Sequence, residues 1–303
     1  MSGPFVICLG EAMVELSLTA QKARTANVGF AGDTLNTAIY LKRALPQARI
    51  AYATKVGTDS FSAQMLAMMA DEALDTSLVL QSPEKTCGLY AITTDDTGER
   101  SFDYWRSASA ARDLLAEPGL GLPHLLDADM VYLSAISLAI LPAAHRTQLL
   151  AWLGEYRSAG GRVAFDSNYR PALWESRETA QAVIESAWRI TDVGMPSIDD
   201  EMAVFGDTDE AAVMQRFAQF GVTCGALKRG GAGPRALDGS PVDTYPPVSK
   251  VVDSTAAGDS FNAAYLAAHL SGAPHAACLR AGHDLASKVI GSRGAILPKQ
   301  ETV

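Results

Sequence analysis

The segments MVYLS (130–134), PAAHRTQLLAWLGEYRSAG (142–160) and RVAFDSN (162–168) decide the fold class. The two short apolar runs have the length of buried strands, and the longer segment between them has the length of a helix. The alternation continues through SRETAQAVIESAWRI (176–190) and TDVGMPS (191–197). Strands that alternate with helices indicate an α/β fold with a mostly parallel sheet and helices on both faces.

Segments on either side of this stretch extend the same pattern. PFVICLG (4–10) is a short apolar run that ends in glycine, which is typical of a buried strand. DTLNTAIYLKRAL, which begins at Asp33, shows helical periodicity. We also expect strands in 49–57 and 224–231, and helices in 60–74, 259–271 and 274–291.

Two β-rich segments interrupt the alternation. AMVELSL (12–18) partly alternates like an exposed strand, and TCGLYAITTD and ERSFDYWR flank the turn signal DTGE (96–99) as in a hairpin. The simplest arrangement has both segments leave the core together as one small sheet, a lid. We therefore expect a nucleotide- and substrate-binding core of residues 1–11, 32–82 and 109–303, and a lid of residues 12–31 and 83–108.

The composition excludes several classes of protein. The 303 residues are 48% hydrophobic and 19% charged, as in ordinary globular proteins, with a formal net charge of −9. Nucleic-acid binders are usually basic, and Lys and Arg do not cluster here. No apolar stretch approaches the ~18 residues of a membrane span, and the N-terminal segment lacks the basic start of a signal peptide. The four cysteines are widely scattered, which predicts free thiols in a reducing cytoplasm.

The stretch DSTAAGDSF (253–261) carries the chemistry. Small residues at the start of a helix expose backbone N–H groups that can hold a phosphoryl group, aided by the helix dipole. Asp259 does not suit an anion site, but it suits a base that accepts the proton of an attacking hydroxyl. The alternative is that Asp259 only caps the helix and Gly258 only makes a turn.

Two common nucleotide motifs are excluded. The chain has no G-x-x-x-x-G-K-[ST] loop. GGAGPRA (230–236) contains G-x-G-x-x-A, but Pro234 and DGSP (238–241) indicate a hairpin where a dinucleotide fold needs a helix.

Three ordered segments resemble the signatures of a known family. DSTAAGDSF resembles the D-T-x-G-A-G-D signature of the ribokinase-like (PfkB) sugar kinases, and GFAGDTLNTA (29–38) resembles their G-G-x-x-x-N-x-A signature. KRGGAG (228–233) resembles their K-x-G-x-x-G nucleotide loop. Together with GLYAITTDDTGERSFDYWR (88–106) and FDSNYRPALW (165–174), they resemble bacterial 2-keto-3-deoxygluconate kinases over essentially the whole chain.

This resemblance implies a ribokinase-like fold and ATP-dependent phosphorylation of a sugar acid. The acceptor would be the terminal 6-hydroxyl of 2-keto-3-deoxygluconate, and the product 2-keto-3-deoxy-6-phosphogluconate. It implies Asp259 as the base and the backbone of Ala256, Ala257 and Gly258 as the anion hole. The substrate residues would be Gly32, Asp33, Thr34, Leu35, Asn36, Tyr90, Tyr104, Arg106, Arg170 and Asp259. The ATP residues would be Asn168, Arg170, Lys228, Gly230, Gly231, Gly233, Ser287 and residues 256–259.

Three positions depart from the family pattern. Ala31 replaces the first glycine of the N-terminal signature, and Ala256 replaces a glycine, so position 256 is not expected to need a positive φ. The N-x-x-E segment linked to magnesium reads Ser-Ile-Asp-Asp at 197–200 and is followed by Glu201. Asp200 or Glu201 would hold Mg²⁺ through water, and the sequence leaves open which.

Arg106 and Arg170 favour a sugar acid because a guanidinium binds a carboxylate through two parallel bonds. Asp33 has the alternative of a plain helix cap. For the whole chain the alternatives are a fructokinase or another sugar kinase of the family, and a sugar-acid sensor without turnover. The expected cofactors are ATP and Mg²⁺, with Mn²⁺ as a substitute, and a monovalent-cation requirement stays open. The exposed lid edge predicts a homodimer.

Overall fold

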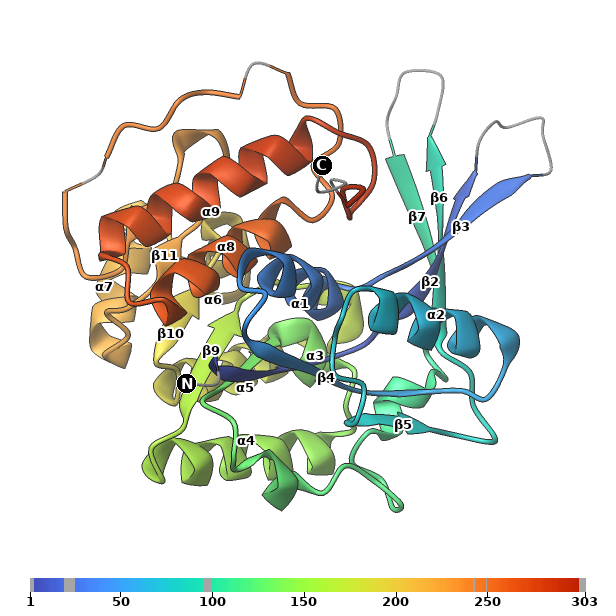
Figure 1. The fold of residues 1–303 in the computed structure, drawn as a ribbon. Coiled ribbons are helices and arrows are strands. Elements are labelled where there is room, and N and C mark those ends of the chain that lie inside the picture. The colour runs from blue at the N-terminus through green and yellow to red at the C-terminus, as the bar shows by residue number, and fades with distance from the viewer. Residues whose placement is uncertain (1–2, 19–24, 95–99, 242, 249, 300–303) are drawn as a thin grey trace.

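The central feature of the fold is a six-stranded sheet in the order β10-β9-β8-β1-β4-β5, in which every pairing is parallel (Figure 1). The computed structural model describes residues 3–18, 25–94, 100–241, 243–248 and 250–299. The strands are β1 (Phe5–Leu9), β4 (Arg49–Val56), β5 (Val79–Gln81), β8 (Met130–Ser134), β9 (Arg162–Asp166) and β10 (Val193–Met195). The parallel α/β core predicted from the alternation is confirmed.

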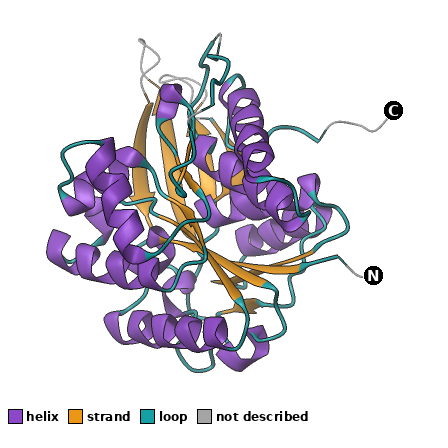
Figure 2. Cartoon of the chain, turned by 90° about the vertical axis from the view of Figure 1, so that its left-hand side faces the viewer, coloured by secondary structure: helices purple, strands orange, loops and turns teal. Residues whose placement is uncertain are grey.

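Helices cover both faces of this sheet (Figures 1 and 2). Alternate residues of a strand point to opposite faces. In β1, Ile7 and Leu9 belong to one hydrophobic cluster and Val6 and Cys8 to the other. The helices on the first side include α3 (Ala135–Ala139), α4 (Ala143–Ser158), α5 (Arg177–Arg189), α6 (Ile198–Phe205) and α7 (Glu210–Phe220); those on the second are α1 (Asp33–Ala44), α2 (Ser60–Asp71), α8 (Ala257–Leu270) and α9 (His275–Ile290).

A second, four-stranded sheet stands out from the core in the order β3-β2-β6-β7 (Figure 1). Its strands are β2 (Met13–Leu18), β3 (Ala26–Ala31), β6 (Gly88–Thr94) and β7 (Arg100–Trp105). β6 and β7 pair antiparallel, with Tyr90 opposite Tyr104, as the hairpin prediction required. The predicted turn DTGE lies outside the described residues. The two β-rich interruptions therefore form one small sheet, and we call it the lid.

The glycine-rich segment after Lys228 forms a hairpin and not a helix. β11 (Ala226–Leu227) pairs antiparallel with β12 (Arg235–Ala236), and Gly230–Ala232 forms a 3₁₀ turn between them. The exclusion of a dinucleotide motif is confirmed.

Three α-helices, α3, α6 and α7, were not predicted from the sequence. Helices α6 and α7 each end at a glycine with a positive φ, Gly206 at 82° and Gly221 at 76°, which is a common helix stop. Among the described residues, no helix combines the length and the apolar character needed to cross a bilayer.

Candidate active site

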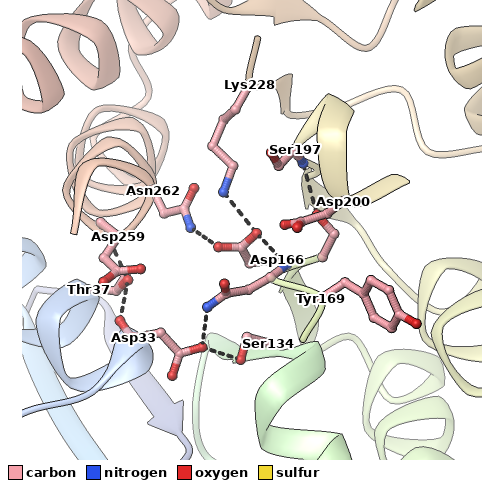
Figure 3. A network of polar contacts seen from close by, with 12 residues as sticks. Asp33, Thr37, Ser134, Asp166, Tyr169, Ser197, Asp200, Lys228, Asp259 and Asn262 are labelled. Carbon is pink, nitrogen blue, oxygen red and sulfur yellow. Dashed lines mark hydrogen bonds and ion pairs between the residues drawn. The ribbon is translucent and has the colours of Figure 1, made fainter. Parts of the chain in front are cut away.

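Four charged side chains from distant segments meet beyond the carboxyl ends of the central strands (Figure 3). Asp33 begins α1, Asp166 ends β9, Lys228 follows β11, and Asp259 lies in the first turn of α8. Ligands of open α/β sheets bind at this edge. The stretches singled out in the sequence therefore come together in one place.

Asp259 is a buried carboxyl group with few partners. Its side chain is 9% exposed, and Asn36 Nδ2 donates to its Oδ2 across 2.8 Å. Burial raises the pKa of Asp259 to about 8, and the nearby charges of Asp33 and Asp166 add to the increase. The hydrogen bond from Asn36 and the charge of Lys228 act in the opposite direction on this pKa. A pKa of about 8 lies in the range that suits a general acid or base.

The loop before Asp259 corrects one prediction. Ala256 caps α8 with φ 60° and ψ 15°, so position 256 does adopt a positive φ, and the contrary expectation was wrong. An alanine tolerates this conformation at a cost of about 1–2 kcal/mol. Ala257 N–H donates to Ser254 O across 3.2 Å in this structure. A Cβ atom on Gly258 would lie 3.4 Å from Lys228 Nζ, so the ammonium group stands directly over the bare backbone.

Asp33 is not a plain helix cap. The cap is Gly32, where a Cβ atom would come within 2.2 Å of Glu11 O, so the close approach of two backbones requires glycine. The Asp33 carboxylate accepts from Ser134 Oγ across 2.5 Å and from Asn168 Nδ2 across 2.8 Å. Asn168, assigned to the ATP side, therefore contacts Asp33 directly.

Asp166 and Asn262 were missed in the sequence. Lys228 Nζ donates to Asp166 Oδ1 across 2.8 Å, and Asn262 Nδ2 donates to Asp166 Oδ2 across 2.7 Å (Figure 3). Asp166 is 2% exposed. Two signals were available: Asp166 ends a predicted strand, and Asn262 lies three residues after Asp259, on the same face of the helix.

A hydroxyl chain connects this pair to α1. The Tyr132 hydroxyl accepts from Asn262 Nδ2 across 3.0 Å and from Thr37 Oγ1 across 3.2 Å. Thr37 Oγ1 also lies 3.3 Å from the backbone oxygen of Asp259. Burial raises the pKa of Tyr132 well above its usual value, and the charges of Asp166 and Asp259 contribute. Tyr132 therefore stays a neutral link between the two parts of the site.

The two acids considered for magnesium lie in different environments. The Asp200 side chain is 21% exposed and lies 3.7 Å from Arg170 NH1; its burial raises its pKa to about 6, although Arg170 opposes the increase. Glu201 is fully buried, 2.9 Å from Arg216, and burial raises its pKa to about 8. Among the described residues, no group of three or more His, Cys, Asp or Glu side chains could hold a metal ion.

Thr34 and Leu35, two further residues assigned to the substrate, are fully buried on α1. The Thr34 hydroxyl is 3.1 Å from the Tyr52 hydroxyl. A substrate contact of these two residues stays a prediction.

Two of the lid residues assigned to the substrate, Tyr90 and Arg106, contact acidic side chains in this structure. The Tyr90 hydroxyl donates to Glu15, and the Arg106 guanidinium pairs with Glu11. Tyr104 is 52% exposed.

The two arginines assigned to the substrate carboxylate occupy different surroundings. Arg106 is 9% exposed and directly follows β7 of the lid. The Arg170 side chain is 54% exposed; its NH1 donates to Tyr169 O and approaches Asp200. Arg170 therefore faces the acid considered for magnesium in this structure.

The remaining residues assigned to ATP lie in the hairpin loop and on α9. Gly230 and Gly233 have φ values of 54° and 77°, and a Cβ atom on Gly231 would meet no atom within 4 Å. Ser287 lies on α9, with its hydroxyl 3.4 Å from His283 Nε2.

Comparisons with known proteins identify the family of the chain. The model of the pfkB family carbohydrate kinases matches residues 4–302. The chain is similar to the 2-dehydro-3-deoxygluconokinase of Escherichia coli K12, with 42% identity over 97% of each chain. The enzyme of that name from Dickeya dadantii is 43% identical over 97% of this chain and 96% of its own.

The fold also has a close counterpart among solved structures. A putative ribokinase II from Escherichia coli in complex with ATP and Mg²⁺ superposes with a TM-score of 0.83 at 21% identity, over 97% of this chain and 94% of that one. The fold resemblance predicted from the sequence is confirmed. The family match spans nearly every residue and includes all the elements that build the site, so the chain belongs to the pfkB family of carbohydrate kinases.

Proposed function

We propose that the protein transfers the γ-phosphoryl group of ATP to the 6-hydroxyl of 2-dehydro-3-deoxygluconate, giving the 6-phosphate and ADP. The observation that carries this proposal is Asp259, a buried carboxyl with a pKa near 8 at the start of α8, beside the Lys228–Asp166 pair. The relatives named for this reaction, 42–43% identical over nearly the full length, support the substrate.

The proposed roles follow from charge and position. Asp259 accepts the proton of the attacking hydroxyl, while the oxygen bonds to phosphorus and ADP leaves. Lys228 and the backbone of residues 256–258 stabilise the negative charge that builds on the transferred group. Asp33 and Asn36 hold substrate hydroxyls, since each offers oxygen or nitrogen atoms in fixed directions. The position of Asp33, Lys228 and Asp259 in one place supports these assignments (Figure 3).

The residues present suit a hydrated Mg²⁺ held mainly by phosphates. Mg²⁺ keeps several waters and uses one or two carboxylates at such sites. Asp200 fits because its side chain is 21% exposed and because the charge of Asp166, which raises the pKa of Asp200, adds to the negative charge at this place. Glu201 does not fit, because it is fully buried against Arg216. Mg²⁺ would neutralise the charge of the triphosphate, and Mn²⁺ would serve as a substitute.

Turnover is expected to require a divalent cation. Exhaustive chelation should abolish phosphoryl transfer, and added Mg²⁺ should restore it, because the γ-phosphate charge needs neutralising. Asp200→Asn should raise the Mg²⁺ concentration for half-maximal rate more than Glu201→Gln does. Full turnover after chelation would contradict the metal requirement, and the reverse order of the two variants would contradict the choice of Asp200.

The rate should depend on pH through Asp259. A base works only when ionised, and its pKa is raised to about 8. We therefore expect kcat/KM to fall about tenfold per unit as pH drops below 8, and to level off above it. A pH–rate profile of kcat/KM for the sugar acid, measured with saturating ATP and Mg²⁺, checks this. A flat profile from pH 6 to 9 would contradict Asp259 as the base.

An ATP-coupled assay on one enzyme preparation tests the proposed function. The acceptors are 2-dehydro-3-deoxygluconate, its galactonate epimer, gluconate, fructose and ribose, and product analysis places the phosphate on the sugar. Preferred turnover of fructose would support the fructokinase alternative. Binding of the sugar acid without any turnover would support the sensor alternative. ATP hydrolysis without acceptor should be far slower than transfer if the lid closes over the substrate.

Exposed apolar side chains on the lid sheet support a homodimer. Leu18, Val28 and Trp105 are 40%, 49% and 61% exposed, which is unusual for side chains of this kind in one small sheet. A second copy of the lid would cover them. Light scattering should give twice the mass of one chain, and Trp105→Glu should shift the protein toward the monomer.

We place the reaction in the cytoplasm, where the four cysteines, which are free in this structure, stay reduced.

A further inference from the structure

A buried ion pair joins the two ends of the lid at its base. Glu11 lies between β1 of the core and β2 of the lid, and Arg106 directly follows β7, where the chain returns to the core. The Glu11 carboxylate contacts the Arg106 guanidinium, with the side chains only 1% and 9% exposed. The first and the last passage of the chain between core and lid are therefore linked by opposite charges that have almost no access to water.

A third part of the lid leaves space for this pair. A Cβ atom on Gly88, the first residue of β6, would lie 2.7 Å from Glu11 Oε1 and 3.1 Å from Arg106 Cβ. Gly88 pairs in register with Met13 of β2, so the lid strands converge here. A side chain at position 88 would therefore displace the carboxylate and press on the stem of the arginine.

We propose that Glu11 is a positioning residue that holds Arg106 in place for the carboxylate of the substrate. This inference rests on the proposed function. A long arginine side chain loses considerable rotamer freedom when it binds. A partner that fixes it beforehand removes that cost from substrate binding, which is how preorganisation increases affinity. Glu11 would act through Arg106 and need not touch the substrate.

The consequence of removing Glu11 depends on where Arg106 would go. A buried charge without a partner is unfavourable, and an arginine can carry its head group to water on its long stem. Its neighbours on β7 already face solvent, with Tyr104 52% and Trp105 61% exposed. The guanidinium carbon lies 6.0 Å from the ring centroid of the half-exposed Tyr104. An unpaired Arg106 should therefore turn outward and leave its position.

The charge of Glu11 also weakens binding of the sugar acid, because a nearby carboxylate repels the carboxylate of the substrate. If this repulsion dominated, removing Glu11 would tighten binding of the sugar acid. We expect the loss of position to dominate, since an outward Arg106 no longer contacts the substrate. The two effects have opposite signs in KM, so one measurement separates them.

The test measures kcat and KM for the sugar acid with Glu11→Gln, Arg106→Ala and the double variant. Glu11→Gln should raise KM about tenfold with a smaller change in kcat. In the Arg106→Ala background the same change should add little, because Glu11 would have no residue left to position. Gly88→Ala, which keeps both charges but displaces them, should raise KM in the same way.

Glu175→Gln is the matched control, because it removes the partner of Arg146, a buried arginine on α4 that is 3% exposed. That variant should leave KM unchanged even if it lowers the melting temperature. An unchanged or lower KM in Glu11→Gln would overturn the inference, and so would fully additive effects in the double variant. Failure of the proposed function is distinguishable, because the wild-type protein would then not phosphorylate the sugar acid at all.

Discussion

Asp259→Asn should reduce kcat by about 10²–10⁴, because the variant cannot accept the proton of the attacking hydroxyl. The loss should appear in kcat and hardly in KM, since an asparagine fills the same space. The amide oxygen can still accept the hydrogen bond that Asn36 now donates to Oδ2. Steady-state kinetics with saturating ATP and Mg²⁺ measure both constants.

At alkaline pH, Asp259→Asn should be more stable than the wild-type protein. The pKa of Asp259 in the folded protein is about 8, above the ~3.9 of an unfolded aspartate. Between these values the folded state holds a proton that the unfolded state has lost, so this group makes stability fall as pH rises. An asparagine at position 259 does not titrate, so it adds no such pH dependence to the stability. The melting temperature of Asp259→Asn should exceed the wild-type value at pH 9, and the difference should shrink toward pH 5.

Two results would contradict this assignment. Near wild-type kcat in Asp259→Asn would show that another group takes the proton. A melting temperature below the wild-type value at pH 9 would show that the carboxylate stabilises the fold there.

The sequence predicted the scaffold because its signals are local and repeated. Alternating strand and helix patterns such as those of residues 130–168 reflect burial on two faces, which each segment records separately. The lid was predicted for the opposite reason, since its two segments break that pattern. Asp259 was singled out as the base because small residues at a helix start expose backbone N–H groups that can hold a phosphoryl group. Helix α6 was missed because eight residues between two loops give little periodicity to detect.

The contacts between distant residues could not be predicted in the same way. Asp166 and Lys228 are 62 positions apart, and nothing local shows that their charges meet. The pairing of Arg106 with Glu11 also depends on three passages of the chain and on the absence of a side chain at Gly88. Asp200 and Glu201 are adjacent in the sequence, and only the orientation of α6 directs one to the site and the other to the core.

Ala256 shows a different limit. The residue type argued against a positive φ, yet the chain adopts 60° there. The preference of an alanine amounts to about 1–2 kcal/mol, which the packing of a whole domain can override. Such local preferences predict a conformation only where the surrounding structure does not impose another.

Lys228→Met should give the second large loss, about 10²–10³ in kcat. Lys228 Nζ is the cation that lies over the backbone at Gly258, where the transferred phosphoryl group would be held. Methionine keeps much of the length and apolar stem while removing the charge. Steady-state kinetics on the variant, with its melting temperature as a check on folding, measure the effect. A decrease below about threefold would contradict the role of Lys228 in stabilising the transferred charge.

Lys228→Met should also shift the pH profile of kcat/KM. This shift separates two effects of the Lys228 charge, which are its effect on the pKa of Asp259 and its stabilisation of the transferred group. Lys228 lowers the pKa of Asp259, so its removal should shift the acidic limb of kcat/KM to higher pH. At pH 7 the decrease in rate would then have two causes, because the missing charge also leaves Asp259 protonated in more of the molecules. On the alkaline plateau Asp259 is ionised, so the decrease there would measure only the lost stabilisation of the transferred group. Lys228→Met also leaves Asp166 without its cation, although Asn262 Nδ2 still donates to it across 2.7 Å. Lys228→Arg keeps the charge in a larger group, and it should restore the position of the limb while recovering only part of the plateau rate, because a guanidinium does not fit a site shaped for an ammonium.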